Sequence, residues 1–128
     1  MDDKKSILLV EDDAFLAKIY AKTFEDAGFD VHLASNGEDG LKLAGRDKTD
    51  IVLLDILLPN MDGFEVLEKL KADEVTKNIP VVILSNLGQR EDVDRALNAG
   101  AAGYLIKAHT MPQKAVNKVK EVLSFNRV

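Results

Sequence analysis

The fold is decided by the stretch S-I-L-L-V-E-D-D, residues 6–13, in which an apolar run leads directly into three acidic residues. Four more short apolar runs, rich in Val, Ile and Leu, recur along the chain, as strands do. Because these runs show little alternation of polar and apolar residues, we expect strands that are buried on both faces. The five predicted strands are Ser6–Val10, Asp30–Ala34, Ile51–Leu54, Pro80–Leu84 and Gly103–Ile106.

The segments that follow the strands carry apolar residues three or four positions apart, as in Val66, Leu67 and Leu70, which predicts amphipathic helices. Strands that alternate with helices form parallel sheets through right-handed crossovers. The expected fold is therefore α/β, with a doubly wound five-stranded parallel sheet. The predicted helices are Ala14–Ala27, Gly37–Ala44, Gly63–Ala72, Arg90–Ala99 and Pro112–Phe125.

The composition is that of one globular domain. The chain has 128 residues, 46% hydrophobic and 30% charged, which suffices for one core and leaves little room for a second domain. The absence of cysteine excludes a disulfide scaffold, a cysteine nucleophile and thiolate metal sites. The net charge of -5 disfavours nonspecific binding to nucleic acid. Without a membrane-length apolar run or a signal-peptide core, we expect a cytoplasmic location and no membrane insertion.

Polar residues stand at the carboxyl ends of four predicted strands. Taken singly, each is more often a helix cap or a solvated side chain, but the carboxyl ends of parallel strands share one edge of the sheet, where sites form. If the first and third strands are neighbours, their carboxylates repel unless a proton or a cation intervenes. Without cysteine or clustered histidine, Mg²⁺ or Mn²⁺ is favoured over zinc. The residues are Glu11, Asp12 and Asp13 after the first strand, Asp55 after the third, Ser85 at the fourth and Lys107 after the fifth.

Four motifs at these strand ends resemble those of the receiver domain of two-component response regulators, including the chemotaxis regulators. They are I-L-L-V-E-D-D (7–13), D-I-L-L-P-N-M-D-G (55–63), V-V-I-L-S (81–85) and Y-L-I-K (104–107), in family order and spacing. The resemblance covers essentially the whole chain. It implies one receiver domain over residues 1–128, with a flavodoxin-like (βα)5 fold and the strand order 2-1-3-4-5.

The resemblance also implies how phosphate and metal would be bound. Asp55 would accept a phosphoryl group from a histidine kinase or a phosphotransfer protein. Mg²⁺, or Mn²⁺ in its place, would be held by Asp12, by Asp55 and by the backbone carbonyl of Leu57. Glu11 would contribute through a water molecule. The protein would then be a signalling phosphoacceptor that catalyses only its own phosphorylation and dephosphorylation, rather than an enzyme with a separate substrate.

The remaining implied roles concern the switch. Lys107 would bind one phosphoryl oxygen, and the Ser85 hydroxyl would bind another once phosphate is present. Tyr104 would rotate inward when Ser85 moves. The surface formed by the fourth helix, the fifth strand and the fifth helix would then engage a protein target or a second copy of the chain, without direct contact to nucleic acid.

Four positions deserve notice because of the family pattern. Ala108 replaces the proline that usually follows the lysine, and Asn86 replaces a small residue beside the switch hydroxyl, where it narrows the pocket or adds a hydrogen bond. Leu57 and Leu87 are apolar at positions that tune dephosphorylation in the family. Because a cis bond before a residue other than proline costs roughly 3 kcal/mol, we expect the Lys107–Ala108 bond to be trans.

Other interpretations remain open at this point. An aspartate-nucleophile phosphatase of the haloacid-dehalogenase type would want a second aspartate two residues after Asp55, where Leu57 stands. A flavodoxin-like FMN carrier would share the topology, but the carboxylates at the strand ends would repel its phosphate. A receiver-like module that no longer accepts phosphate is disfavoured by the complete set of acidic, hydroxyl and lysine residues. The chain could be a stand-alone regulator or a receiver taken from a longer protein.

Overall fold

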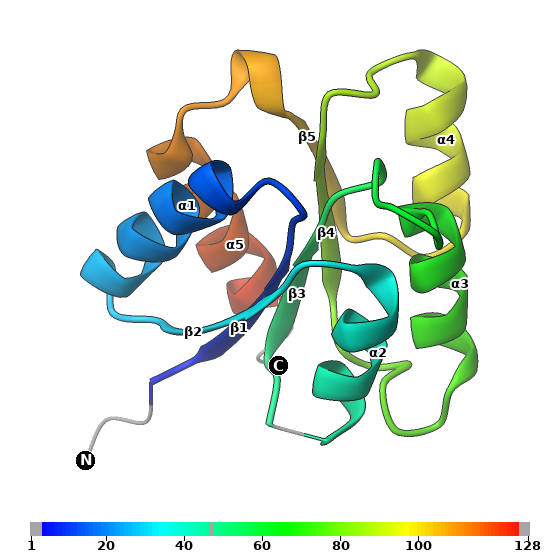
Figure 1. Cartoon of the computed structure of the whole chain (residues 1–128), viewed down its shortest axis with the longest axis horizontal. Helices are drawn as coiled ribbons and strands as arrows, with labels where there is room; N and C mark the ends of the chain where they lie inside the picture. The colour runs from blue at the N-terminus through cyan, green and yellow to red at the C-terminus, as the bar shows by residue number, and fades with distance from the viewer. Residues whose placement is uncertain (1–3, 47, 126–128) are drawn as a thin grey trace.

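Five parallel strands form a single sheet in the order β2-β1-β3-β4-β5 (Figure 1). The structure is a computed structural model that describes residues 4–46 and 48–125. The predicted fold class and strand order are thereby confirmed. The strands are β1 (Ser6–Val10), β2 (Asp30–Ala34), β3 (Ile51–Leu54), β4 (Val81–Ser85) and β5 (Gly103–Ile106).

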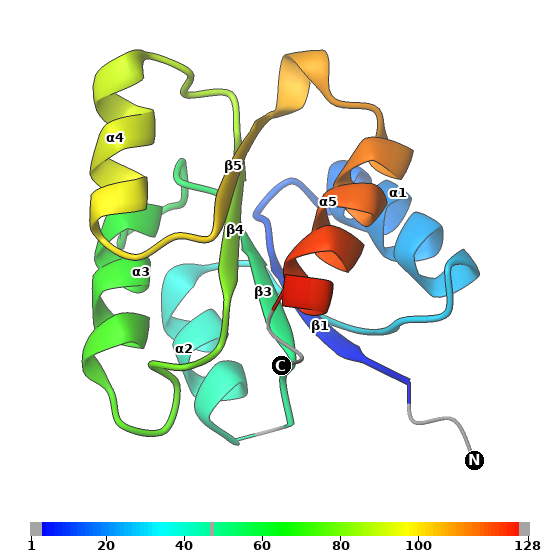
Figure 2. The ribbon, with the colours of Figure 1, turned by 180° about the vertical axis from the view of Figure 1, so that it is seen from behind.

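Helices cover both faces of the sheet. One face carries α1 and α5, and the other carries α2, α3 and α4, as the two opposite views show (Figures 1 and 2). Alternate residues of each central strand therefore enter separate apolar clusters, with Ile7 and Leu9 on the α1 side and Leu8 and Val10 on the other. The helices are α1 (Ala14–Asp26), α2 (Gly37–Arg46), α3 (Gly63–Ala72), α4 (Arg90–Asn98) and α5 (Pro112–Phe125).

Burial differs between the central strands and the edge strands. Every residue of β1, β3 and β4 is buried, as predicted from their continuous apolar runs. The same prediction was wrong for β2 and β5, which lie at the two edges of the sheet and are only partly buried. An edge strand has a neighbour on one side only, so the flanking helices cover it less completely.

Most predicted boundaries agree with the structure to within two residues. The fourth strand is shifted by one residue, because Pro80 has no N–H to donate to the sheet, whereas Ser85 pairs with Ile106. The helices α1 and α4 end one residue earlier than predicted. In each case the next residue is the C-cap, and it is followed by a glycine at positive φ, Gly28 at 97° or Gly100 at 107°.

A single 3₁₀ turn, Lys107–His109, follows β5 and was not predicted. The peptide bond between Lys107 and Ala108 is trans, as expected.

Among the described residues, no helix is long and apolar enough to cross a membrane. The carboxyl ends of the strands all lie at the upper edge of the sheet in Figure 1, where the candidate residues are found.

Candidate functional site

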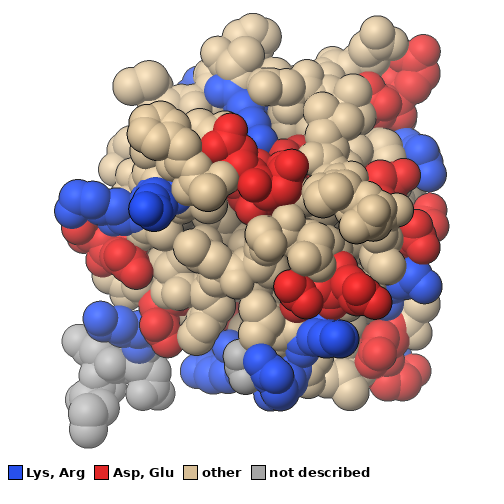
Figure 3. Space-filling view, viewed as in Figure 1, with Lys and Arg blue, Asp and Glu red and all other residues tan. Residues whose placement is uncertain are grey.

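Three carboxylates meet at the carboxyl ends of β1 and β3. The two strands are neighbours, with Val10 opposite Leu54, so the residues that follow them lie side by side. One carboxylate oxygen from each of Glu11, Asp12 and Asp55 can be chosen so that all three lie within 4.8 Å of one another. Glu11 and Asp55 are buried, and Asp12 is exposed. The predicted acidic cluster therefore exists, and acidic surface is visible at the centre of the face shown in Figure 3.

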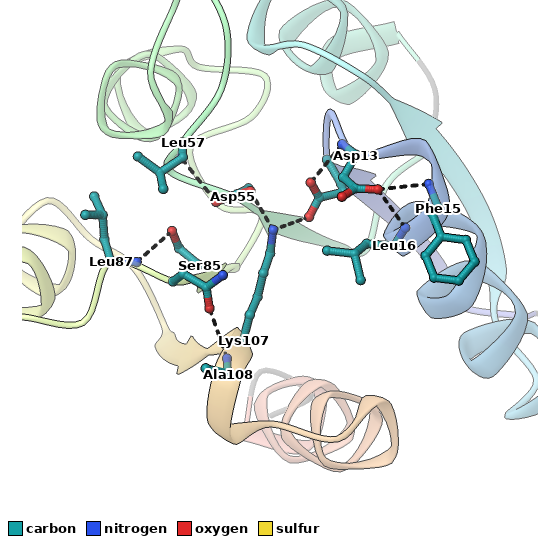
Figure 4. A network of polar contacts seen from close by, with 11 residues as sticks. Asp13, Phe15, Leu16, Asp55, Leu57, Ser85, Leu87, Lys107 and Ala108 are labelled. Atoms are coloured by element: carbon teal, nitrogen blue, oxygen red, sulfur yellow. Dashed lines mark hydrogen bonds and ion pairs between the residues drawn. The ribbon is translucent and has the colours of Figure 1, made fainter.

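The Lys107 side chain reaches into this cluster from the turn after β5 (Figure 4). Its Nζ lies 2.7 Å from Asp55 Oδ2 and 2.5 Å from Glu11 Oε1. The lysine side chain is only 11% exposed, so both ion pairs are shielded from water. Burial lowers the lysine pKa, but the two carboxylates outweigh that effect and hold it above its ordinary value. The ammonium therefore stays charged beside Asp55.

Each buried carboxylate is held by a second donor from the backbone. Asp55 Oδ1 accepts the Leu57 N–H at 3.1 Å, and Glu11 Oε2 accepts the Asp13 N–H at 3.0 Å. Burial raises the pKa of the Glu11 carboxyl, against the opposing effect of its bonds with Lys107 and the Asp13 N–H. These bonds fix the orientation of both carboxylates.

The aspartates that flank the cluster have structural roles. Asp13 caps α1, because its side chain accepts the N–H groups of Phe15 and Leu16. Asp62 caps α3 in the same way, through the N–H of Glu65. These caps begin the helices immediately after the loops that carry the cluster.

Ser85 and Tyr104 both contact the loop between β4 and α4. Ser85 is fully buried, and its Oγ accepts the Leu87 N–H at 3.3 Å. The Tyr104 hydroxyl donates to the Leu87 carbonyl at 2.6 Å, and burial raises its pKa. Both side chains are therefore bonded to the loop that leads into α4.

Two contacts of the site were missed at the level of sequence. The first is the ion pair from Lys107 to Glu11, since spacing alone indicates which residues share an edge and not which oxygen a lysine reaches. The second is the partner of Asn86, for which the sequence allowed a hydrogen bond without naming a donor: its Oδ1 accepts the Ala108 N–H at 3.0 Å. Asn86 and Ala108 both depart from the family pattern, and these two departures were the signal from which the bond could have been predicted.

The donor set suits a hard divalent cation. All three candidate side chains offer carboxylate oxygens, which Mg²⁺ prefers, and no cysteine exists in the chain to favour a softer metal. Asp12 is the exposed member of the cluster, so a cation has access to it from solvent. The residues present therefore fit the expected magnesium ion.

Comparison with known proteins identifies the class to which this fold and site belong. The family model described as the response regulator receiver domain matches residues 7–120. The chain therefore belongs to the receiver domain family of two-component response regulators, as the resemblance of its motifs predicted.

Individual relatives agree with this assignment. The chain is 36% identical over 118 residues to the probable transcriptional regulator ycf29 of Porphyra purpurea, covering 92% of this chain and 56% of that protein. It is 40% identical over 101 residues to the DNA-binding dual master transcriptional regulator RpaA of Synechocystis, covering 79% of this chain and 42% of that protein. The chain thus spans about half the length of these relatives.

A solved structure shows the same fold over nearly the full length. It is the CheY-like response regulator receiver domain protein of Methanospirillum hungatei, at 30% identity and a TM-score of 0.88, with 95% of each chain covered. Because the name of one relative describes DNA binding, the relatives do not support the expectation of no direct contact with nucleic acid.

Proposed function

We propose that Asp55 accepts a phosphoryl group from a phosphohistidine of a histidine kinase or phosphotransfer protein. The observation that carries this proposal is the largely shielded Lys107 ammonium 2.7 Å from the Asp55 carboxylate, inside an acidic cluster that can hold a divalent cation. Phosphoryl transfer needs a positioned oxygen nucleophile and positive charge over the oxygens of the transferred group. Asp55 supplies the first requirement, and Lys107 supplies part of the second.

The proposed metal ligands are Asp12, Asp55 and the backbone carbonyl of Leu57, with Glu11 acting through water. When bound, Mg²⁺ neutralises charge on the phosphoryl oxygens, and Mn²⁺ can substitute for it. Backbone N–H groups already orient the Glu11 and Asp55 carboxylates, which supports this arrangement. These two carboxylates would therefore be oriented in advance to hold a cation.

The transfer needs no reactant besides the phosphohistidine and the Asp55 carboxylate. An Asp55 carboxylate oxygen attacks phosphorus, the bond from phosphorus to the imidazole nitrogen breaks, and the electron pair leaves with the imidazole, whose other ring nitrogen carries a proton so that the leaving group is neutral. Lys107 shifts its hydrogen bond toward a phosphoryl oxygen as negative charge accumulates there. The Ser85 hydroxyl donates to another phosphoryl oxygen. The product is an aspartyl phosphate, and water later hydrolyses it to inorganic phosphate.

The proposed output is a change of the surface formed by α4, β5 and α5. Ser85 and Tyr104 both bond to the Leu87 segment, which leads into α4, so movement of the Ser85 hydroxyl is transmitted to that helix. The partner is a downstream protein or a second copy of the chain. One receiver domain over residues 1–128, acting in the cytoplasm, remains part of this proposal.

The rival interpretations have less support. Leu57, which is 54% exposed, occupies the position at which a phosphatase of the haloacid-dehalogenase type would need a second aspartate, and it has no acid group to offer. A flavin phosphate would meet the carboxylates of Glu11, Asp12 and Asp55 at the strand ends. We therefore favour a signalling phosphoacceptor without a separate substrate.

Intact mass after incubation with acetyl phosphate tests the proposal. We expect the parent to gain one phosphoryl group in Mg²⁺ and to gain none in EDTA, because without the cation the incoming phosphate meets three carboxylates and one lysine. Asp55→Asn should abolish the gain, whereas Asp62→Asn, at the cap of α3, should retain it. Labelling of Asp55→Asn as fast as the parent would show that the phosphoryl group goes elsewhere.

A further inference from the structure

A hydrogen bond joins the loops that follow β4 and β5, next to two residues of the proposed site. The Ala108 N–H donates to Asn86 Oδ1 at 3.0 Å. Ser85 immediately precedes Asn86, and Lys107 immediately precedes Ala108. The last paired residues of the two strands are Ser85 and Ile106, so this bond extends their contact beyond the end of the sheet (Figure 4).

The bond satisfies a backbone donor at the start of the 3₁₀ turn. The first N–H groups of any helical turn have no partner within the turn itself. Ile106, at the N-cap position, provides no side-chain hydrogen bond, and Asn86 supplies an acceptor from a different loop. The bond therefore fixes the beginning of the turn, which is also the backbone of Lys107.

The same loop is held against β5 at two other points. The Tyr104 hydroxyl donates to the Leu87 carbonyl at 2.6 Å. A Cβ added at Gly88 would lie 2.5 Å from Ile106 Cδ1, which shows that the Gly88 backbone packs closely against the Ile106 side chain. Ser85 pairs with Ile106 before Asn86, and Leu87 and Gly88 contact β5 after it, so the loop that carries the Asn86 amide is held on both sides.

We infer that Asn86 is a positioning residue for phosphoryl transfer, whose Oδ1 holds the Ala108 N–H and so aims Lys107 at Asp55. The inference rests on the proposed function, because it assigns Asn86 a part in the chemistry of Asp55. Asn86 and Ala108 both depart from the family pattern, and the hydrogen bond needs both departures. A proline at 108 would have no N–H to donate, and a small residue at 86 would have no acceptor to offer.

Two substitutions separate the hydrogen bond from the bulk of the side chain. Asn86→Ala removes the acceptor and enlarges the pocket, whereas Asn86→Leu removes the acceptor and keeps a branched side chain of similar shape. Both should lower the rate constant for phosphorylation by acetyl phosphate roughly fivefold, as expected for one lost hydrogen bond. The affinity for Mg²⁺, measured by calorimetry, should stay within about twofold, because the metal ligands are unchanged. Asn78→Ala, an exposed site at the opposite end of β4, should match the parent.

Ala108→Pro removes the donor and completes a double-mutant cycle. If Asn86 acts through the Ala108 N–H, Asn86→Leu should slow the Ala108→Pro protein by less than about twofold. A further fivefold loss in the double variant would show that Asn86 acts elsewhere. An acceleration in Asn86→Ala together with a slowing in Asn86→Leu would overturn the inference in favour of simple crowding of the pocket.

Hydrogen exchange tests the bond without reference to phosphorylation. The Ala108 amide should exchange at least fivefold faster in Asn86→Leu than in the parent, while the Leu87 amide should change little. An Ala108 amide that exchanges equally fast in both proteins would overturn the inference. If the parent takes up no phosphoryl group, the proposed function fails, and with it the assigned role, even where the exchange experiment confirms the bond.

Discussion

Single residues decide how closely the backbone can approach the site, and Gly63 is the clearest case. A Cβ at this position would lie 2.3 Å from the Asp55 carbonyl oxygen and 2.5 Å from Ile56 Cα. Both atoms belong to the backbone and cannot move aside as a side-chain tip would. The first residue of α3 therefore packs directly on the segment that carries the proposed phosphoacceptor.

We expect Gly63→Ala to destabilise the protein by about 1–3 kcal/mol, because the added methyl group forces the backbones apart. The measurement is the midpoint of denaturant unfolding. Gly45→Ala is the matched control, since its Cβ would meet nothing within 4 Å and alanine favours the α2 helix. A Gly63→Ala protein as stable as the control would contradict the close packing.

Two leucines near Asp55 should determine the lifetime of the aspartyl phosphate. Leu57 is 54% exposed, and its backbone N–H is bonded to Asp55 Oδ1, so the residue adjoins the nucleophile. Leu87 packs against the apolar cluster on the α4 side. Neither side chain can orient the water that hydrolyses the acyl phosphate.

Leu57→Asn should therefore shorten the lifetime, by roughly five- to thirtyfold if the amide contributes about 1–2 kcal/mol in the transition state alone. The decay of the phosphoryl mass shift measures it, with Leu87→Glu as a second polar variant. Val75→Asn, an exposed site in the loop between α3 and β4, serves as control. Decay at the parental rate in both polar variants would show that apolar shielding does not set the lifetime.

At the scale of elements, strands and helices with a regular pattern of apolar residues can be predicted from the sequence, whereas a turn of a few residues cannot. Continuous apolar runs such as Ile51–Leu54 identify a central strand reliably, because both faces of such a strand are buried. The turn Lys107–His109 has three residues and therefore no period to detect. The bond between Asn86 and Ala108 depends on the path of two loops, 22 residues apart in the sequence, and not on either segment alone.

The elements also set the expected direction of signalling. Ser85 Oγ accepts the Leu87 N–H, so movement of the Ser85 side chain toward a phosphoryl oxygen disturbs a bond to the loop that leads into α4. Beryllofluoride, which mimics the phosphoryl group on an aspartate, should therefore shift amide resonances of α4 and of residues 104–107. Asp55→Asn should abolish these shifts. Large shifts confined to α2 and α3 would contradict this route.

At the scale of the whole molecule, the site follows from the topology. Parallel strands bring residues 11, 55 and 107 to one edge of the sheet, although they lie far apart in the sequence, and this could be predicted. The repulsion between carboxylates could be predicted as well, but not that Lys107 pairs with Glu11 in addition to Asp55. Lys107 neutralises the two buried carboxylates only in part, so that Asp12 adds unfavourable charge near the pair Glu11 and Asp55.

This balance makes the stability of the resting protein depend on the metal. Asp12→Ala removes one of three clustered carboxylates, so in EDTA it should raise the free energy of unfolding by roughly 0.5–1 kcal/mol and the melting temperature by about 2–4 °C. Millimolar Mg²⁺ should stabilise the parent, because a ligand that binds only the folded state favours it, and it should have little effect on Asp12→Ala. Asp39→Ala, in the first turn of α2 and outside the cluster, should respond to Mg²⁺ as the parent does. Thermal unfolding in EDTA and in Mg²⁺ measures all three proteins. Equal melting temperatures for the parent and Asp12→Ala in both buffers would mean that the carboxylates neither repel one another appreciably nor share a cation, despite lying within 4.8 Å.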